Sequence, residues 1–156
     1  MFIKSIVPVL LMSTSVSLAC PDLAGTYQCA YQYSEGKNEQ ISIQQDGNKF
    51  IIKHGSSDSV LNIIADGKKN SVQFNDDEKL ESIYQCEENS LKTTSYFSSV
   101  KNNRGSILGS EYKKISANSI EFSAIIAPTV NGVETFVNKS TYLNCNKIDS
   151  ALADKP

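Results

Sequence analysis

The sequence contains no tryptophan and a single histidine, His54. Hydrolysis through an activated serine or cysteine needs a base beside the nucleophile, and His54 is the only imidazole available. It is followed by Gly55 and Ser56, a setting typical of an ordinary surface residue. No Gly-x-Ser-x-Gly segment occurs either. These absences predict that the protein is not an enzyme and has no catalytic residues.

Spacings typical of metal and cofactor sites are also missing. There is no Cys-x-x-Cys pair, so zinc would need ligands at long and irregular intervals. The densest acidic run, Asp76-Asp77-Glu78, lacks the spaced oxygens and central glycine of a calcium loop. We interpret it as a solvated loop, with a weak calcium site as the alternative. No phosphate-binding or dinucleotide-binding glycine motif occurs, so we expect no metal and no cofactor.

Clustered positive charge is absent. The longest basic runs are Lys68-Lys69 and Lys113-Lys114, and the formal net charge is −2. A protein that follows a phosphate backbone needs a contiguous positive face. We therefore expect no nucleic-acid partner and no attachment to an anionic membrane surface.

No apolar stretch reaches the roughly 20 residues that a membrane-spanning helix needs. Residues 1–19 instead have the pattern of a cleaved secretory signal, with Lys4, an apolar stretch and a small-x-small site at Ser17-Leu18-Ala19. This predicts a periplasmic or secreted protein with one domain at 20–148 and a flexible tail at 149–156. A lipid anchor at Cys20 is the alternative, which the Ser-Leu order before the cysteine disfavours.

All four cysteines follow that signal, and an even number in an oxidising compartment predicts two disulfides. The residues are Cys20, Cys29, Cys86 and Cys145. Three pairings are open. We favour Cys20 with Cys29 across a turn, and Cys86 with Cys145 joining a middle strand to the last one.

Helix signals are almost absent, whereas short runs of β-branched and aromatic residues recur about every ten residues. We expect strands at 26–33, 39–45, 49–53, 60–65, 71–74, 81–86, 91–98, 106–114, 119–127 and 134–143. Alternation such as Ile120, Phe122, Ala124 and Ile126 indicates one buried face per strand. This pattern predicts an all-β protein, an antiparallel up-and-down barrel of about 8–10 strands, with a β-sandwich as the alternative.

Three dipeptides fit tight hairpin turns, because each supplies a residue that tolerates positive φ. They are Asp46-Gly47, Asp66-Gly67 and Asn131-Gly132. We expect each to join two strands that are antiparallel neighbours.

Three tyrosines and one phenylalanine are the candidate ligand-binding residues. Tyr27, Tyr31 and Tyr33 are two apart, so they share one face of a strand, and Phe122 belongs to the buried face of another strand. A ligand would stack on these rings. Ordinary packing is the alternative, since tyrosine is favoured in strands of any function.

The segment from Cys20 to Tyr27 resembles the start of lipocalin-like small secreted bacterial β-barrels, in which a short turn leads into Gly-x-Trp. Gly25-Thr26-Tyr27 fills that place, with tyrosine instead of tryptophan. The resemblance implies an interior cavity for a small apolar ligand.

A second resemblance is to periplasmic barrel inhibitors of lysozyme, which carry a Ser-Gly-x-x-Tyr loop. Gly109-Ser110-Glu111-Tyr112 keeps the glycine and the tyrosine, but Leu108 stands in place of the serine. The leading hypothesis is therefore an exported, non-enzymatic barrel that binds a small apolar ligand. The alternatives are a protein-interaction or inhibitor module with an envelope protein as partner, and a structural envelope protein without a ligand.

Overall fold

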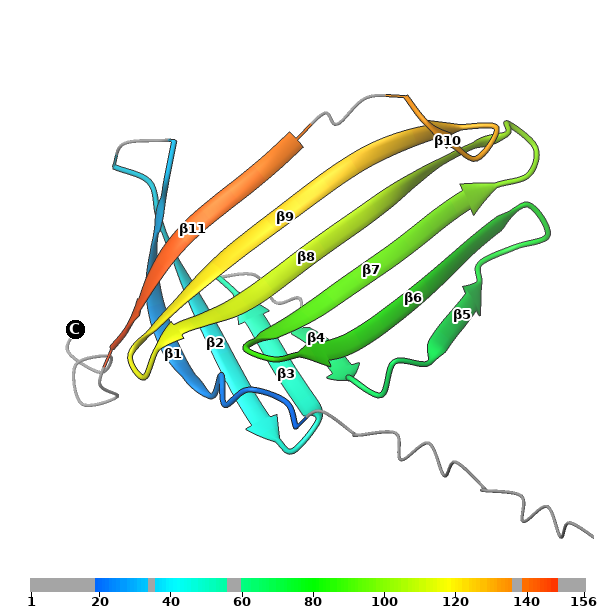
Figure 1. The fold of residues 1–156 in the computed structure, drawn as a ribbon. Coiled ribbons are helices and arrows are strands. Elements are labelled where there is room, and N and C mark those ends of the chain that lie inside the picture. The colour runs from blue at the N-terminus through cyan, green and yellow to red at the C-terminus, as the bar shows by residue number, and fades with distance from the viewer. Residues whose placement is uncertain (1–18, 34–35, 56–59, 136–138, 149–156) are drawn as a thin grey trace, which may run out of the picture.

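A computed structural model describes residues 19–33, 36–55, 60–135 and 139–148. Within these ranges the chain forms one antiparallel sheet of 11 strands (Figure 1). The strands are β1 (Gly25–Tyr31), β2 (Asn38–Asp46), β3 (Lys49–His54), β4 (Val60–Ile64), β5 (Lys69–Gln73), β6 (Glu78–Glu87), β7 (Ser90–Ser99), β8 (Arg104–Ser116), β9 (Ser119–Val130), β10 (Val133–Glu134) and β11 (Lys139–Lys147). None of the described residues forms a helix long and apolar enough to span a membrane. Most of the expected signal and the whole expected tail lie outside the described residues.

The strand order confirms the all-β, antiparallel prediction. Neighbours run β4-β3-β2-β1-β11-β9-β8-β7-β6-β5, and the short β10 pairs with β9. The chain therefore winds up and down around the sheet, and its last strand lies beside its first, with Cys29 opposite Cys145. Within the described residues, β4 and β5 stand at the two ends of this order and do not pair with each other, so the sheet is not closed into a continuous ring.

The opening lies at a turn that the sequence predicted to be a hairpin. Gly67 has the expected positive φ of 71°, but β4 and β5 diverge instead of pairing. The turn's own amides bond to other parts of the chain: Ala65 N–H donates to the Asn48 carbonyl and Gly67 N–H to the Tyr84 carbonyl, both at 2.9 Å. Because these bonds hold the turn to two different neighbours, Asp66-Gly67 joins the two edges of the sheet without closing it.

The other two turns are confirmed. Asp46-Gly47 joins the paired strands β2 and β3, and Asn131-Gly132 joins β9 to β10. The last expected strand, 134–143, was misplaced: β10 ends at Glu134, and β11 starts at Lys139 and continues through Cys145.

The strands differ in length, and this divides the molecule into two parts. β1, β3 and β4 have 7, 6 and 5 residues, whereas β6 to β9 have 10, 10, 13 and 12. At about 3.3 Å per residue, β8 is roughly 20 Å longer than β3. Figure 1 shows β1 to β4 gathered against one end of the long strands.

The packed part, which we call the near core, lies where the short strands face the long ones. Its buried residues are Leu23, Tyr27, Cys29, Ile41, Ile43, Phe50, Ile52, Ile63, Ala65, Leu91, Tyr112, Ile120, Phe122, Leu143 and Cys145. Residues before β1 close its outer end, because Leu23 is fully buried and its N–H donates to the Gln45 side chain at 2.8 Å. Burial of this many aliphatic and aromatic side chains is the main force that stabilises the fold.

Both predicted disulfides are present, but the favoured pairing was wrong. Cys20 is bonded to Cys86, and Cys29 to Cys145. Cys29 and Cys145 lie directly opposite each other on β1 and β11, which brings their Cβ atoms within bonding reach. The first bridge ties the segment before β1 to the end of β6, a proximity that strand spacing along the chain does not reveal.

Candidate functional site

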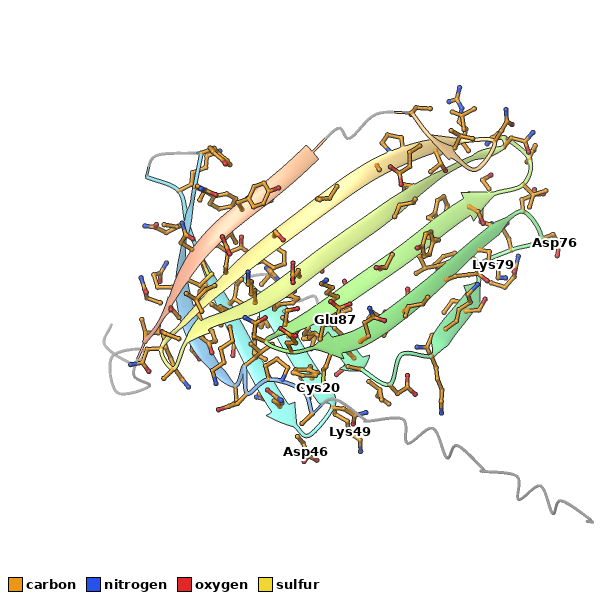
Figure 2. The ribbon with its side chains drawn as sticks, viewed as in Figure 1. Cys20, Asp46, Lys49, Asp76, Lys79 and Glu87 are labelled. Atoms are coloured by element: carbon orange, nitrogen blue, oxygen red, sulfur yellow. A yellow bond between two sulfur atoms is a disulfide. The ribbon has the colours of Figure 1, made fainter. Side chains whose placement is uncertain are left out.

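The long strands continue past the near core and carry a second inner surface, which we call the far face. Cross-strand register places its residues on the same side of the sheet as the near core. They are Leu80 and Ser82 of β6, Thr93, Ser95 and Phe97 of β7, Ser106, Leu108 and Ser110 of β8, and Ala124, Ile126 and Pro128 of β9. In Figure 2, Cys20 and Glu87 lie at the near-core end of the long strands, and Asp76 and Lys79 lie at the opposite end, beside the far face.

Exposure changes sharply along single strands from the near core to the far face. On β8, Tyr112 is 2% exposed and Leu108, on the same face, is 41% exposed. On β9, Phe122 is 8% exposed and Ile126 is 38% exposed. Side chains two or four residues apart point to the same side of a strand, so their orientation is not the cause. Ser82 and Thr93, the far-face residues next to the near core, are still buried, whereas the region around Leu108 and Ile126 lacks the facing layer that covers the near core.

Small hydroxyl side chains line much of the far face and bond to one another. The Ser82 and Ser95 hydroxyl oxygens lie 2.8 Å apart, and those of Thr93 and Ser110 lie 2.7 Å apart. Short side chains leave room above the sheet, and paired hydroxyls carry little desolvation penalty when an apolar group covers them. The surface can therefore contact the apolar part of another molecule.

A hydrogen-bonded network lies between the near core and the far face. Tyr31 donates its hydroxyl hydrogen to Glu39 Oε2 at 2.8 Å, and the other carboxylate oxygen of Glu39 is 2.9 Å from His54 Nδ1. His54 Nε2 is 2.8 Å from the Tyr112 hydroxyl. A carboxylate only accepts, so this geometry fits a histidine that carries its hydrogen on Nδ1 and accepts from Tyr112 on Nε2. The four side chains form one polar floor.

Strand alternation positions this network. Glu39 is two residues before Ile41 on β2, and His54 is two residues after Ile52 on β3, so both share the inner face with core residues. His54 also packs against Phe122, with ring centroids 4.9 Å apart. The interpretation of His54 as a surface residue was therefore wrong, and the same period-two pattern that identified the core residues was the signal that could have found it.

The environment raises the pKa of two phenols in this region. Burial, and to a smaller extent the Glu39 charge, raises the pKa of Tyr112 well above its ordinary value of 10.0. The hydrogen bond to Glu39 is the largest cause of the raised pKa of Tyr31. Both groups remain hydrogen donors at neutral pH, so neither phenol is a ready nucleophile there.

The predicted ligand-binding residues do not form one stacking surface. Tyr27 is buried in the near core and donates its hydroxyl hydrogen to the Leu23 carbonyl at 3.0 Å. Tyr33 lies beyond the end of β1, is 76% exposed, and contacts Tyr142 edge to face. Tyr31 and Phe122 do meet the polar floor, through Glu39 and His54 respectively.

The lysozyme-inhibitor-like segment is not a loop. Gly109-Ser110-Glu111-Tyr112 lies within β8, and Tyr112 points into the near core. A buried tyrosine in the middle of a strand cannot insert into a partner's cleft, so this segment gives no support to the inhibitor alternative.

A hollow of about 640 Å³ lies at the near end, away from the far face. Its lining includes Cys20, Gln45 and Asp66, and so surrounds the point where the two sheet edges meet. Among the described residues no group of three His, Cys, Asp or Glu side chains is arranged to hold a metal ion.

Comparisons with known proteins give no family. No protein-family model matches the chain, and no curated protein matches its sequence. Among solved structures, it is similar to a secretary abundant heat soluble (SAHS) protein from Ramazzottius varieornatus, at 12% identity and a TM-score of 0.46. That match covers 82% of this chain and 96% of the other. A likeness of this degree carries no information about function.

Proposed function

We propose that the chain is an exported, non-enzymatic β-barrel-like protein that carries a small amphipathic ligand on its far face. The supporting observation is the exposure of Leu108 and Ile126 on the same side of β8 and β9 as the buried Tyr112 and Phe122. Large apolar side chains that are exposed on the inner side of a sheet favour a ligand that replaces the missing layer.

The polar floor gives the ligand an orientation. Glu39 and His54 are only partly buried, and they lie where the far face meets the near core. The apolar part of a ligand would lie along β7 to β9, and its polar end would reach this floor. Few, well-placed polar groups at one end of an apolar surface are typical of sites that bind small amphipathic molecules.

The absence of catalysis is part of the proposal. All four cysteines are bonded in pairs, and both ring nitrogens of His54 are engaged by Glu39 and Tyr112. Burial raises the pKa of Tyr112 further above its ordinary value, so its hydroxyl is still less available as a nucleophile than that of an exposed tyrosine. We interpret the network as a binding floor and not as a proton relay.

Export is supported by the two disulfides, which are typical of proteins in oxidising compartments. The proposal includes cleavage after Ala19 and a periplasmic or extracellular location. The proposal includes an unlipidated Cys20, and the Cys20–Cys86 disulfide supports it, because one sulfur atom cannot hold both bonds. Native mass spectrometry of protein purified from its host without reductant should give the mass of the chain without residues 1–19, with two disulfides, no acyl group and a retained small molecule.

A matched pair of substitutions tests the location of the site. Leu108 and Ile125 are both 41% exposed, but Ile125 lies on the outer face of the neighbouring strand. Binding of anilinonaphthalene sulfonate, an amphipathic dye, should weaken about tenfold in Leu108→Glu and stay unchanged in Ile125→Glu. Urea unfolding of both variants checks that the fold is kept. Equal effects of the two substitutions, or none, would contradict a site on the far face.

A further inference from the structure

Among the described residues no strand pairs with the outer edge of β4, and the backbone groups on that edge can be assigned residue by residue. The Ala65 N–H bonds to the Asn48 carbonyl, which continues the register in which Ile64 is opposite Lys49. In an antiparallel ladder, bonded and non-bonded pairs alternate. Leu61 and Ile63 therefore bond to β3, whereas the N–H and C=O groups of Val60, Asn62 and Ile64 point away from it.

The bonds on the other side of β3 give the same assignment. Gly55 N–H donates to the Gln40 carbonyl at 2.6 Å, and these residues continue the register in which His54 is opposite Ile41. Alternation from that pair directs the backbone N–H and C=O groups of Lys49, Ile51 and Lys53 toward β2. The backbone groups of Phe50 and Ile52 therefore point toward β4. The free edge of β4 thus consists of Val60, Asn62 and Ile64.

The chemistry of this edge is unusual for a strand left open to water. β4 has the sequence Val-Leu-Asn-Ile-Ile, without charge or proline, and Val60, Leu61 and Ile64 are exposed. Natural edge strands are normally protected by lysine, proline or a bulge. The other edge of the sheet follows this rule, because Lys69 of β5 pairs with Glu81 and follows Lys68. β4 lacks such protection.

We propose that β4 pairs with β4 of a second copy of this chain, antiparallel, about a two-fold axis at Asn62. In this register Val60 lies opposite Ile64 of the second copy, Leu61 opposite its Ile63, and Asn62 opposite its Asn62. The outward backbone groups of residues 60, 62 and 64 are those that the register needs to exchange hydrogen bonds.

The side chains are complementary in the same register. Every apolar residue of β4 meets another apolar residue, the asparagine amides meet each other, and no like charges are opposed. Pairing of β4 with β5 of another copy would instead leave one open edge at each end and produce chains of molecules. The two-fold arrangement buries both unprotected edges and closes.

Charge substitutions at the two-fold axis test this pairing. Asn62 is exposed, so a charge there does not disturb the near core. Asn62→Lys and Asn62→Asp should each weaken dimer formation about tenfold or more, because like charges then face each other. Mixing the two variants should restore the dimer. Ser71→Lys and Ser71→Asp on the outward edge of β5 are the matched controls, and neither should affect it.

The readouts are light scattering coupled to size-exclusion chromatography over a concentration series, and amide hydrogen exchange. The full chain should reach twice its monomer mass, and the amides of Val60, Asn62 and Ile64 should gain protection as the dimer forms. A monomer at every concentration up to about 1 mM, a dimer that survives Asn62→Lys, or a dimer lost in the Ser71 variants would each overturn the proposal.

Discussion

Tyr112 and Leu108 belong to one strand and one face, yet only Tyr112 is buried. The same contrast holds on β9 between Phe122 and Ile126. The long strands are continuous across both regions, so the hydrogen-bonded sheet is equally present in each. The difference arises from the opposing layer, which ends with the short strands. A strand's inner face is therefore a core only as far as another layer covers it.

The two regions also differ in side-chain chemistry. The inner residues of the near core are aromatic and aliphatic, and both disulfides lie there. On the far face, serine and threonine alternate with a few exposed apolar residues. The near core therefore stabilises the fold, and the far face contributes less to stability, which is consistent with the proposed binding site.

Removal of the Cys29–Cys145 bridge should have the largest effect. It links the first and last strands of the near core across 116 residues, and closing a loop of that size stabilises by about 4–5 kcal/mol in the chain-entropy model. The double variant Cys29→Ala/Cys145→Ala should lose stability of that order in urea unfolding. A loss below about 1 kcal/mol would show that β1 and β11 are held by packing and hydrogen bonds alone.

A leucine-to-alanine substitution in each region compares directly how much the two regions contribute to stability. Leu91 is fully buried on β7, and its substitution by alanine should cost about 3 kcal/mol of unfolding free energy. Leu108→Ala on the far face should cost about 1 kcal/mol or less. Both values come from urea unfolding of the protein without ligand. Similar costs would mean that Leu108 is covered in solution.

The loss of stability at alkaline pH should depend on Tyr112. Its folded-state pKa is raised above 10.0, so its contribution is complete below that pH and is lost as the pH rises further. Thermal unfolding of the unsubstituted protein should therefore show a falling midpoint above pH 10. Tyr112→Phe should reduce this fall, and at neutral pH it should cost about 1 kcal/mol, because His54 loses a hydrogen bond. An unchanged alkaline limb would contradict the burial of this phenol.

The smallest effect is expected at Glu81, on the outer face of the long strands. Hydrogen bonds from Lys79 and Lys69 lower the pKa of the Glu81 carboxyl. A lowered folded-state pKa stabilises above the ordinary value of 4.5, and this contribution is lost as the pH falls through the folded pKa. Glu81→Gln should slightly flatten the fall of the melting midpoint in acid at low salt. The difference should vanish in about 1 M salt, since exposed ion pairs are screened.

Local patterns in the sequence predicted most of the strands. Period-two alternation, such as that of Ile41 and Ile43 or of Ile120 and Phe122, depends only on which side chains favour a buried face. These residues are buried in the structure as predicted. Asp46-Gly47 was equally informative, because a positive-φ turn between two adjacent strands needs no distant partner.

Predictions that depended on distant contacts failed. Asp66-Gly67 has hairpin chemistry, but the bonds of Ala65 and Gly67 to Asn48 and Tyr84 hold β4 and β5 apart. The cysteine pairing was misjudged for the same reason, since Cys20 reaches Cys86 only after the sheet has curved. His54 was missed because Glu39 and Tyr112, which give it a role, lie on other strands.

By itself, the sequence determined the all-β class, the approximate strand positions and the presence of four cysteines, because side-chain alternation and turn chemistry are properties of neighbouring residues. The tertiary structure decided where the sheet stays open, how the cysteines pair, and which inner residues remain uncovered. The first two features depend on contacts between segments that are distant in the sequence, and the third depends on the relative lengths of strands that meet only after folding. The buried Tyr112 and the exposed Leu108 follow the same pattern of alternation, and only the end of the facing layer separates them.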